Sequence, residues 1–313
     1  MRSARWSTWI AIAAVLAGPF AWACNRGDDV GGGTTVALVL KTLNNPFFIE
    51  LAAGAQEAAD SLGIELLVQA PDREIDVEKQ MQIIENLLQT DIDALALTPS
   101  GSREVVPAIA KANRAEVPVL IVDTRADAEA LAAAGATVAT FIGSDNVEGG
   151  RIAGRFVAEA LGGEGNVAVI EGIPGHETGD SRLRGFREAI SEYPGISIVA
   201  SQTANWERDQ AFNVTQNMLQ SHSDLRAIFA ANDVMALGAV EAVASAGRTG
   251  DLVVVGFDAQ DEAVAAIREG VMSASIAQHP REMGRIAVES AWKILQGDSV
   301  PAEQPVSIEL VTE

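Results

Sequence analysis

From residue 35 onward, short apolar runs rich in β-branched residues alternate with longer amphipathic stretches, and this alternation constrains the fold most strongly. The early runs are apolar at nearly every position, which is typical of strands whose sheet is covered by helices on both faces. Repeated strand–helix–strand units imply parallel sheets with right-handed crossovers, and hence an α/β protein. The expected strands are residues 35–40, 64–69, 94–98, 117–123, 138–142, 166–171, 196–201, 227–230, 252–257, 273–277 and 306–311.

The segments between the apolar runs have helical periodicity. Val77, Met81, Ile84 and Leu88 recur at the spacing of one helical face. There are enough strand–helix units for two doubly wound domains, and a length of 313 residues agrees with two domains at about 100–200 residues each. In such sheets, ligands bind beyond the carboxyl ends of the strands.

Polar side chains that end the expected strands are therefore the first candidates for a binding site. Asp123, Asn232, Asp258 and Gln278 all stand at such positions. Asp and Asn at the end of a strand also serve as N-caps of the following helix. Ligand contact and helix capping stay open as alternative roles for Asp123, Asn232 and Asp258.

The charge of the chain excludes several classes of function. With 22 Lys and Arg against 43 Asp and Glu, the net charge is −21. Such acidity argues against binding nucleic acid, which needs clustered cations, and against an electrostatic grip on anionic lipid. One Cys excludes an intrachain disulfide framework. The three His (His176, His222 and His279) are widely spaced, so we expect no His-rich metal site. We also expect no cofactor.

The first residues are typical of an export signal. Arg2 and Arg5 precede a short apolar run at 9–17, and Ala-Trp-Ala at 21–23 is a small-residue cleavage site. The run is too short for a membrane span of about 20 residues. We therefore predict a signal peptide at 1–23 and an exported protein.

Cys24 directly follows the predicted cleavage site, and this resembles a bacterial lipoprotein, in which that Cys is lipidated. Simple secretion with a spare thiol is the alternative. Residues 24–33 are polar and Gly-rich, which suits a flexible tether. Membrane attachment is expected only through this lipid.

Five short motifs occur in order along the chain: TLNNPFF at 42–48, GSDNVEGG at 143–150, ANDVMALG at 231–238, VVGFD at 254–258 and SIAQ at 275–278. Together they resemble the ribose-type periplasmic sugar-binding proteins, the solute-binding components of ABC importers. The resemblance implies two Rossmann-like lobes joined by a three-segment hinge, with the ligand between them. The implied N-terminal lobe is 34–143 plus 279–306, and the C-terminal lobe is 144–278 plus 307–313.

The resemblance also implies ligand contacts. Phe47 and Trp206 would sandwich the ligand, and Phe48 would wall the pocket. The residues expected to hydrogen-bond hydroxyls are Asn45, Asp123, Asn232, Asp258 and Gln278. This set suits a sugar, because flat aromatic faces cover its C–H surface while carboxylates and amides pair with its hydroxyls.

Three further site residues depart from the ribose-specific pattern. Thr98 stands in place of Asn and Thr124 in place of Arg, and ungapped alignment puts Asp180 in place of a second Arg. The pocket would then be rich in carboxylates and poor in donors. It would favour a polyol or amino sugar over ribose, and it would disfavour acidic or phosphorylated sugars. A local shift that brings Arg125 or Arg182 into the site stays open.

The expected function is capture of a small neutral or amino-substituted sugar or polyol and its delivery to an ABC permease. No nucleophile elbow and no phosphate loop occur in the sequence, so we expect no enzyme, and the ATPase would be a separate chain. We expect a monomer, because a protein that closes about a hinge must keep both lobes exposed. Two alternatives stay open: a sensor that presents its closed form to a membrane receptor, and, weakly, an exported glycosidase, whose carboxylate separation sequence does not give.

Overall fold

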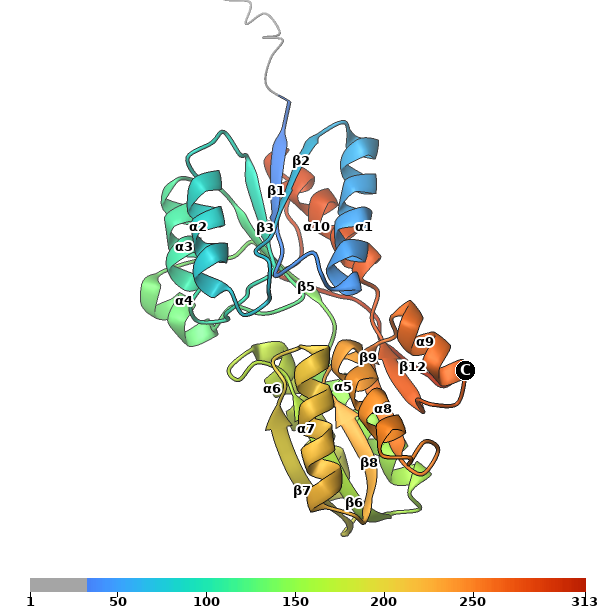
Figure 1. Ribbon diagram of the computed structural model, residues 1–313. Coiled ribbons are helices and arrows are strands. Elements are labelled where there is room, and N and C mark those ends of the chain that lie inside the picture. The colour runs from blue at the N-terminus through green and yellow to red at the C-terminus, as the bar shows by residue number, and fades with distance from the viewer. Residues whose placement is uncertain (1–32) are drawn as a thin grey trace, which may run out of the picture. The chain divides into compact units, whose positions relative to one another are not determined.

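Two six-stranded sheets organise the computed structural model, which describes residues 33–313 (Figure 1). The first sheet runs in the order β11 (Glu303–Pro305), β5 (Thr140–Gly143), β4 (Val119–Val122), β3 (Ala94–Leu97), β1 (Thr35–Val39) and β2 (Glu65–Gln69). The second runs β12 (Glu309–Val311), β10 (Ala274–Ala277), β9 (Val253–Asp258), β8 (Leu225–Ala230), β6 (Glu164–Glu171) and β7 (Gly195–Thr203). All pairings are parallel except that of β12 with β10.

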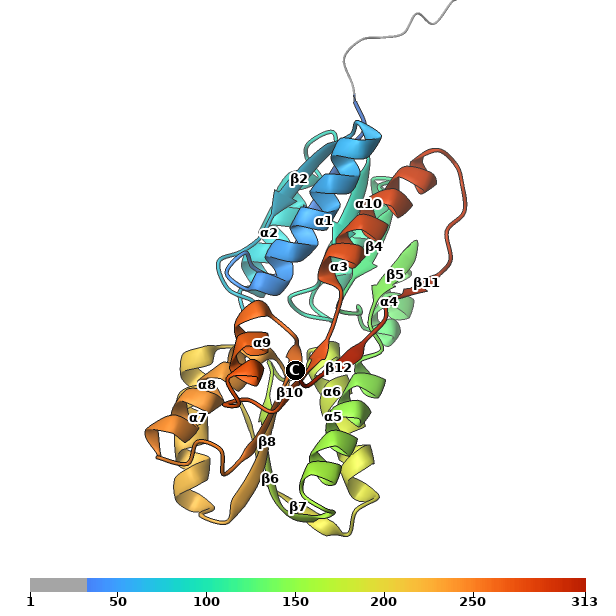
Figure 2. The same ribbon diagram turned by 90° about the vertical axis from the view of Figure 1, so that its right-hand side faces the viewer.

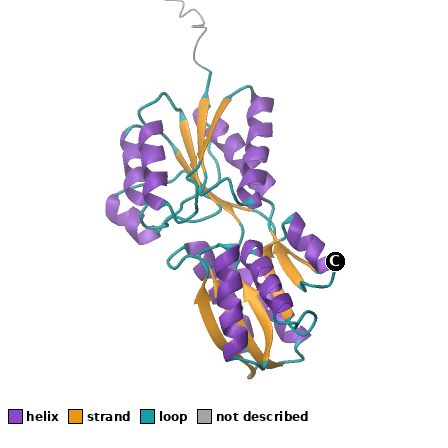
Figure 3. Cartoon of the chain, viewed as in Figure 1, coloured by secondary structure: helices purple, strands orange, loops and turns teal. Residues whose placement is uncertain are grey.

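Helices cover both faces of the first sheet (Figure 3). One face packs against α1 (Pro46–Leu62) and α10 (Pro280–Leu295). The other packs against α2 (Val77–Leu87), α3 (Val106–Arg114) and α4 (Ala128–Ala134). The central strands are therefore buried on both sides, which explains why β1, β3 and β4 are almost entirely apolar.

The second sheet is covered in the same way. One face packs against α7 (Arg208–Ser221), α8 (Asp233–Ser245) and α9 (Asp261–Arg268). The other packs against α5 (Asn146–Ala160) and α6 (Glu177–Ser191). The predicted α/β fold with two doubly wound lobes is confirmed, and the first ten expected strands match observed strands with end shifts of one or two residues.

The chain passes between the two sheets at three places, between β5 and α5, between β10 and α10, and between β11 and β12 (Figure 2). The prediction of one strand at 306–311 is wrong. Residues 303–305 pair with β5, whereas 309–311 pair with β10. The backbone N–H of Val306 donates to the carbonyl of Gly143 at 3.0 Å, so two of the three crossings are joined where the chain changes sheets.

The predicted signal peptide, Cys24 and all of the tether except Gly33 lie outside the described residues. Among residues 33–313, no helix combines the length and the apolar composition that crossing a membrane would require. The same residues hold no group of three or more His, Cys, Asp or Glu side chains arranged to bind a metal ion.

Glycines allow the closest helix contacts in both lobes. A Cβ on Gly284 of α10 would lie 1.9 Å from the carbonyl oxygen of Leu51 on α1. In the second lobe, a Cβ on Gly150 of α5 would lie 2.0 Å from the carbonyl oxygen of Arg182 on α6. Side chains at these positions would push the helices apart, because the obstacle in each case is backbone.

Gly284→Ala should therefore destabilise the protein. Overpacking of this kind costs about 1–3 kcal/mol, which exceeds what alanine gains in helix propensity. Urea unfolding should show the lower stability as a reduced midpoint. Lys293→Ala on the exposed side of the same helix is the control and should stay within about 0.5 kcal/mol of the wild type. Equal midpoints for Gly284→Ala and the wild type would contradict the close packing of α1 and α10.

Candidate ligand-binding cleft

A cavity between the lobes lies at the carboxyl ends of strands of both sheets. Its lining residues are Lys41, Asn45, Phe47, Phe48, Glu74, Asp123, Thr178, Arg182, Trp206, Asn232, Asp258 and Gln278. Eight of the eleven residues expected to bind ligand are in this set. The remaining three, Thr98, Thr124 and Asp180, do not line it.

On the first lobe, the cavity presents a buried ion pair. Asp123 directly follows β4 with φ 63°, and its Oδ2 lies 3.4 Å from Nζ of Lys41, which follows β1 closely. Both side chains are almost fully buried. The hydroxyl of Thr124 donates to the same Asp123 oxygen at 2.8 Å. The sequence analysis missed Lys41, although its place just after a strand is the signal that identified Asp123.

On the second lobe, Arg182 and Asp258 form the corresponding pair, with Nη1 3.6 Å from Oδ1. Nε of Arg182 donates to Oδ1 of Asn146 and Nη1 donates to the carbonyl of Ala231, both at 2.8 Å. The guanidinium also lies 3.7 Å from the ring centroid of Phe257, within cation–π range. Two of its five N–H donors are used in these two hydrogen bonds.

The predicted role of Asp180 is wrong. Asp180 is exposed on the outer side of α6, beside Leu183 and Arg184. The buried side of α6, which faces α5, carries Thr178 and Arg182. Of these two residues of α6, Arg182 and not Asp180 therefore lines the cavity.

The two threonines lie beside the cavity rather than in its wall. Thr98 is fully buried at the end of β3, and its hydroxyl has no partner among the described residues. Thr124 is buried behind Asp123, and its hydroxyl lies 2.7 Å from that of Thr178 on the other lobe. Arg125 points elsewhere, since it pairs with Glu303 and stacks on Phe141.

These corrections change the predicted chemistry of the pocket. Lys41 and Arg182 supply cationic donors, so the expectation of a donor-poor pocket is wrong. The amide of Gln278 adds a donor and already reaches Oδ1 of Asp258 at 2.8 Å. A ligand oxygen that can only accept, such as a ring oxygen, therefore has partners within this wall.

Helix capping accounts for part of the roles of the two asparagines. Oδ1 of Asn45 accepts from the backbone N–H of Phe47 at 3.0 Å, and Oδ1 of Asn232 accepts from that of Met235 at 2.9 Å. Asp123 and Asp258 cap no helix, because Asp127 caps α4 and Gln260 stands at the N-cap of α9. Both carboxylates are thus available to the cavity.

Glu74 is a cavity carboxylate that the sequence analysis missed. It lies in the loop after β2, where no motif marks it, and its Oε1 accepts from Nδ2 of Asn45 at 3.0 Å. Burial raises the pKa of Glu74, while the charge of Lys41 and the hydrogen bond from Asn45 oppose the rise. Burial likewise raises the pKa of Asp258, opposed first by the charge of Arg182.

Aromatic side chains from both lobes complete the wall. The rings of Phe47 and Phe48 meet edge to face with centroids 5.2 Å apart. Trp206 comes from the loop before α7 with φ 66°, and its indole packs so closely on Gly172 that a Cβ there would lie 2.1 Å away. The indole Nε1 donates to Nδ1 of His176 at 3.4 Å. His176 is buried, so this hydrogen bond restricts the orientation of the indole ring.

His176 gives the protein a measurable pH dependence. Burial, helped by the charge of Lys41, lowers the pKa of His176 from 6.5 to about 3. Between those values the unfolded chain binds a proton at this histidine that the folded chain does not, so the contribution of His176 to stability falls as the pH drops through this window. From pH 7 to 5 the loss is about 2 kcal/mol.

His176→Gln keeps an acceptor for Trp206 and removes the titration, so the change in its unfolding free energy from pH 7 to pH 5 should be about 2 kcal/mol more favourable than that of the wild type. Urea unfolding at the two values measures the difference. His222→Gln, at a partly exposed histidine, is the matched control and should follow the wild type. An equal change in unfolding free energy between pH 7 and pH 5 in all three proteins would show that His176 does not cause this pH dependence.

Comparisons with known proteins agree with this architecture. The family described as "Periplasmic binding protein domain" matches residues 36–299. The ribose import binding protein of Haemophilus influenzae is 41% identical over 89% of this chain and 91% of its own length. The D-allose-binding periplasmic protein of Escherichia coli is 36% identical over 88% and 91%.

Solved structures give the same result. A periplasmic solute-binding protein of an ABC transporter from Actinobacillus succinogenes, with bound D-allose, is 41% identical to this chain with a TM-score of 0.85. The match covers 89% of this chain and 97% of that one. A solute-binding protein from Bacillus halodurans with bound myo-inositol has a TM-score of 0.82 at 27% identity, covering 90% and 95%. The chain belongs to the periplasmic binding protein domain family.

Proposed function

We propose that this protein captures a neutral monosaccharide of the ribose or allose type between its lobes and delivers it to an ABC permease. The observation that carries the proposal is the cavity in which each lobe contributes one carboxylate–cation pair and one aromatic wall. The relatives named for ribose and D-allose, and the neighbour with bound D-allose, support the same ligand class.

The charges of the cavity favour a neutral ligand with many hydroxyls. Three carboxylates (Glu74, Asp123 and Asp258) face two cations (Lys41 and Arg182). A sugar phosphate or sugar acid would add negative charge to a wall in which carboxylates already outnumber cations. Hydroxyls can donate to the carboxylates and accept from the cations, so a neutral sugar pairs with both.

The ligand-binding residues that we propose are those of the expected set that line the cavity, together with the two cations and Glu74. They are Lys41, Asn45, Phe47, Phe48, Glu74, Asp123, Arg182, Trp206, Asn232, Asp258 and Gln278. Phe47 and Trp206 are proposed to cover the C–H faces of the sugar, since they come from opposite lobes.

Binding is proposed to work by closure of the lobes, taken as 34–143 plus 279–306 and 144–278 plus 307–313. Contacts between the lobes accompany the closed cleft. Nη2 of Arg73 lies 3.0 Å from Oε1 of Glu207, and Nε2 of Gln260 donates to Oδ1 of Asn45 at 2.9 Å. Ligand would favour this state because only here do both walls contact it.

The remaining parts of the proposal concern the protein's partners and location. Family members are exported periplasmic components of ABC importers, and we propose export through 1–23 with a lipid anchor at Cys24. The protein would act as a monomer. It would bind and release its ligand without catalysing a reaction, because its task is complete when the closed form docks on the permease. The ATPase would be a separate chain.

Asp258→Ala tests the proposed site, with Asp180→Ala as a matched carboxylate control outside it. Isothermal titration calorimetry with D-allose, D-ribose, ribitol and myo-inositol should find at least one neutral ligand for the wild type. Asp258→Ala should weaken that ligand at least about 30-fold, because it leaves Arg182 buried without its partner carboxylate. Asp180→Ala should bind as the wild type does.

Two results would contradict the proposal. Wild-type affinity in Asp258→Ala would show that the cavity is not the ligand site. No heat with any ligand of the panel, from protein that unfolds cooperatively, would show that the ligand is not of this class.

A further inference from the structure

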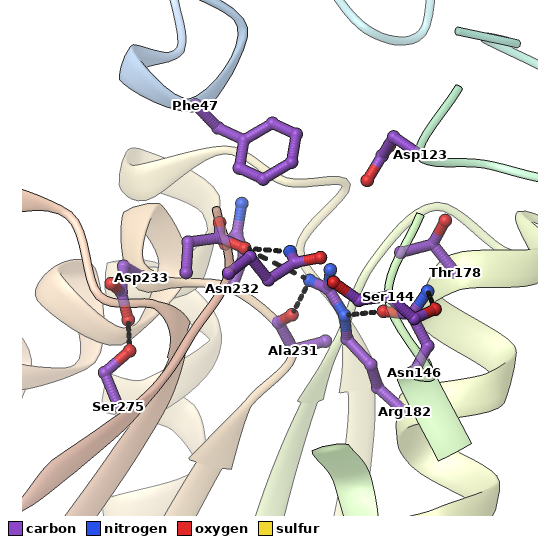
Figure 4. Close-up of polar contacts among 12 residues, drawn as sticks. Phe47, Asp123, Ser144, Asn146, Thr178, Arg182, Ala231, Asn232, Asp233 and Ser275 are labelled. Atoms are coloured by element: carbon purple, nitrogen blue, oxygen red, sulfur yellow. Dashed lines mark hydrogen bonds and ion pairs between the residues drawn. The ribbon is translucent and has the colours of Figure 1, made fainter. Parts of the chain in front are cut away.

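A buried carboxylate behind the cavity supports the turn that carries Asp258. Asp233 opens α8, is fully buried and does not line the cavity. Both of its oxygens are in use. Oδ1 accepts from the hydroxyl of Ser275 at 2.7 Å (Figure 4), and Oδ2 accepts from the backbone N–H of Gln260 at 2.8 Å.

Ser275 extends this support by one further hydrogen bond. Its Oγ accepts from the backbone N–H of Ala259 at 2.9 Å while its hydroxyl donates to Asp233. The N–H groups of two successive residues, Ala259 and Gln260, are therefore held by one Asp–Ser pair. The absence of a side chain at Gly256 makes room for this arrangement, because a Cβ there would lie 2.2 Å from Oδ1 of Asp233.

The turn needs such support because its backbone is unfavourable. Asp258 has φ 117° and Ala259 has φ 49°, both in a region that L-residues other than glycine seldom adopt. Backbone of this kind persists only where surrounding contacts over-determine it. The two N–H groups anchored on Asp233 and Ser275 directly follow the strained residue Asp258.

Helix capping does not account for the Asp233 side chain. The N-cap of α8 is Asn232, whose side chain accepts from the N–H of Met235. Both hydrogen bonds accepted by Asp233 come from outside α8, from β10 and from the turn after β9. Burial and the nearby charge of Asp258 raise the pKa of Asp233, while the bond from Ser275 opposes the rise.

The supported turn has two consequences for the site. Asp258 faces the cavity with Arg182 and Gln278 as partners. Two residues later, the side chain of Gln260 reaches across to Asn45 of the other lobe at 2.9 Å. One buried pair thus sets both a ligand-facing carboxylate and a contact between the lobes.

We propose that Asp233, with Ser275, is a positioning residue that aims Asp258 at the ligand and Gln260 at the opposite lobe, so that ligand contact and closure depend on the same support. This inference rests on the proposed function. It assigns to Asp233 no contact with the ligand.

The test compares three substitutions with a matched control. Asp233→Ala removes both acceptors, and Ser275→Ala removes the anchor of Ala259. Asp233→Asn is the conservative variant, because its amide oxygen can accept from Gln260 while its NH2 donates to Ser275. Ser273→Ala is the control, since its Oγ also accepts a backbone N–H, from Val254 at 3.2 Å, but away from the turn.

Affinity for D-allose and D-ribose would be measured by calorimetry, and closure by the ligand-induced decrease in radius of gyration in X-ray scattering. Asp233→Ala should weaken binding at least about tenfold and reduce the decrease in radius of gyration at saturating sugar, because the acceptors of two buried hydrogen bonds are lost. Ser275→Ala should weaken binding severalfold. Asp233→Asn should recover most of the affinity, and Ser273→Ala should stay within about twofold of the wild type.

Wild-type affinity and closure in both Asp233→Ala and Ser275→Ala, even with a lower melting temperature, would overturn the inference, because a purely structural role predicts that pattern. If Asp233→Ala does not fold, Ser275→Ala and Asp233→Asn decide between the two roles. If the wild type binds neither these sugars nor any other ligand of the calorimetric panel, the proposed function fails, and the inference fails with it. Sugar binding by the wild type that is insensitive to these substitutions overturns the inference alone.

Discussion

The burial of opposite charges at the carboxyl ends of both sheets is the constraint on which the cleft depends. Arg182 and Asp258 are each almost fully removed from water, and desolvation of such a pair is recovered only with good geometry and further hydrogen bonds. Asn146, Ala231 and the ring of Phe257 provide them for the guanidinium. α5 and α6 approach closely at Gly150, which packs against the backbone carbonyl of Arg182. This contact fixes the backbone from which the Arg182 side chain extends. The packing of α5 against α6 therefore holds the backbone of the residue that carries the charge.

Both lobes bury an aspartate and a cation together, at equivalent positions of their sheets. β4 and β9 hold equivalent positions in the two sheets, and each is followed or ended by an aspartate with positive φ, Asp123 and Asp258. Each aspartate has a buried cation, Lys41 on one lobe and Arg182 on the other. Neither lobe alone surrounds a ligand, so each presents half a site with its charges already paired. A neutral ligand can then bridge the halves without having to compensate an isolated buried charge.

The sequence predicted the fold well because alternating apolar runs and helical stripes are local patterns that tertiary context did not override. The strand-end rule found Asp123 and Asp258, and it would also have found Lys41, which nearly adjoins β1. Glu74 was not predictable in this way, because it lies in a loop whose course depends on packing. The error at Asp180 was one of helical phase. Thr178, Arg182, Gly185 and Ala189 recur on the buried side of α6 at helical spacing, and that periodicity excludes Asp180 from the cavity.

The strained turn at Asp258 shows why such sites resist prediction from local sequence. Glycine would adopt φ 117° at less cost, but it would remove the carboxylate that faces the cavity and pairs with Arg182. The strain and the charge therefore occur together, and the hydrogen bonds that balance the strain come from α8 and β10, distant in the chain. The same turn places Gln260 against Asn45, so the hydrogen bonds that hold Asp258 in position also fix one contact across the cleft. Under the proposed function, a ligand that pairs with Asp258 would therefore strengthen the backbone geometry that supports closure. Closure would in turn shield the Arg182–Asp258 pair from water, and the attraction between two charges is stronger away from water.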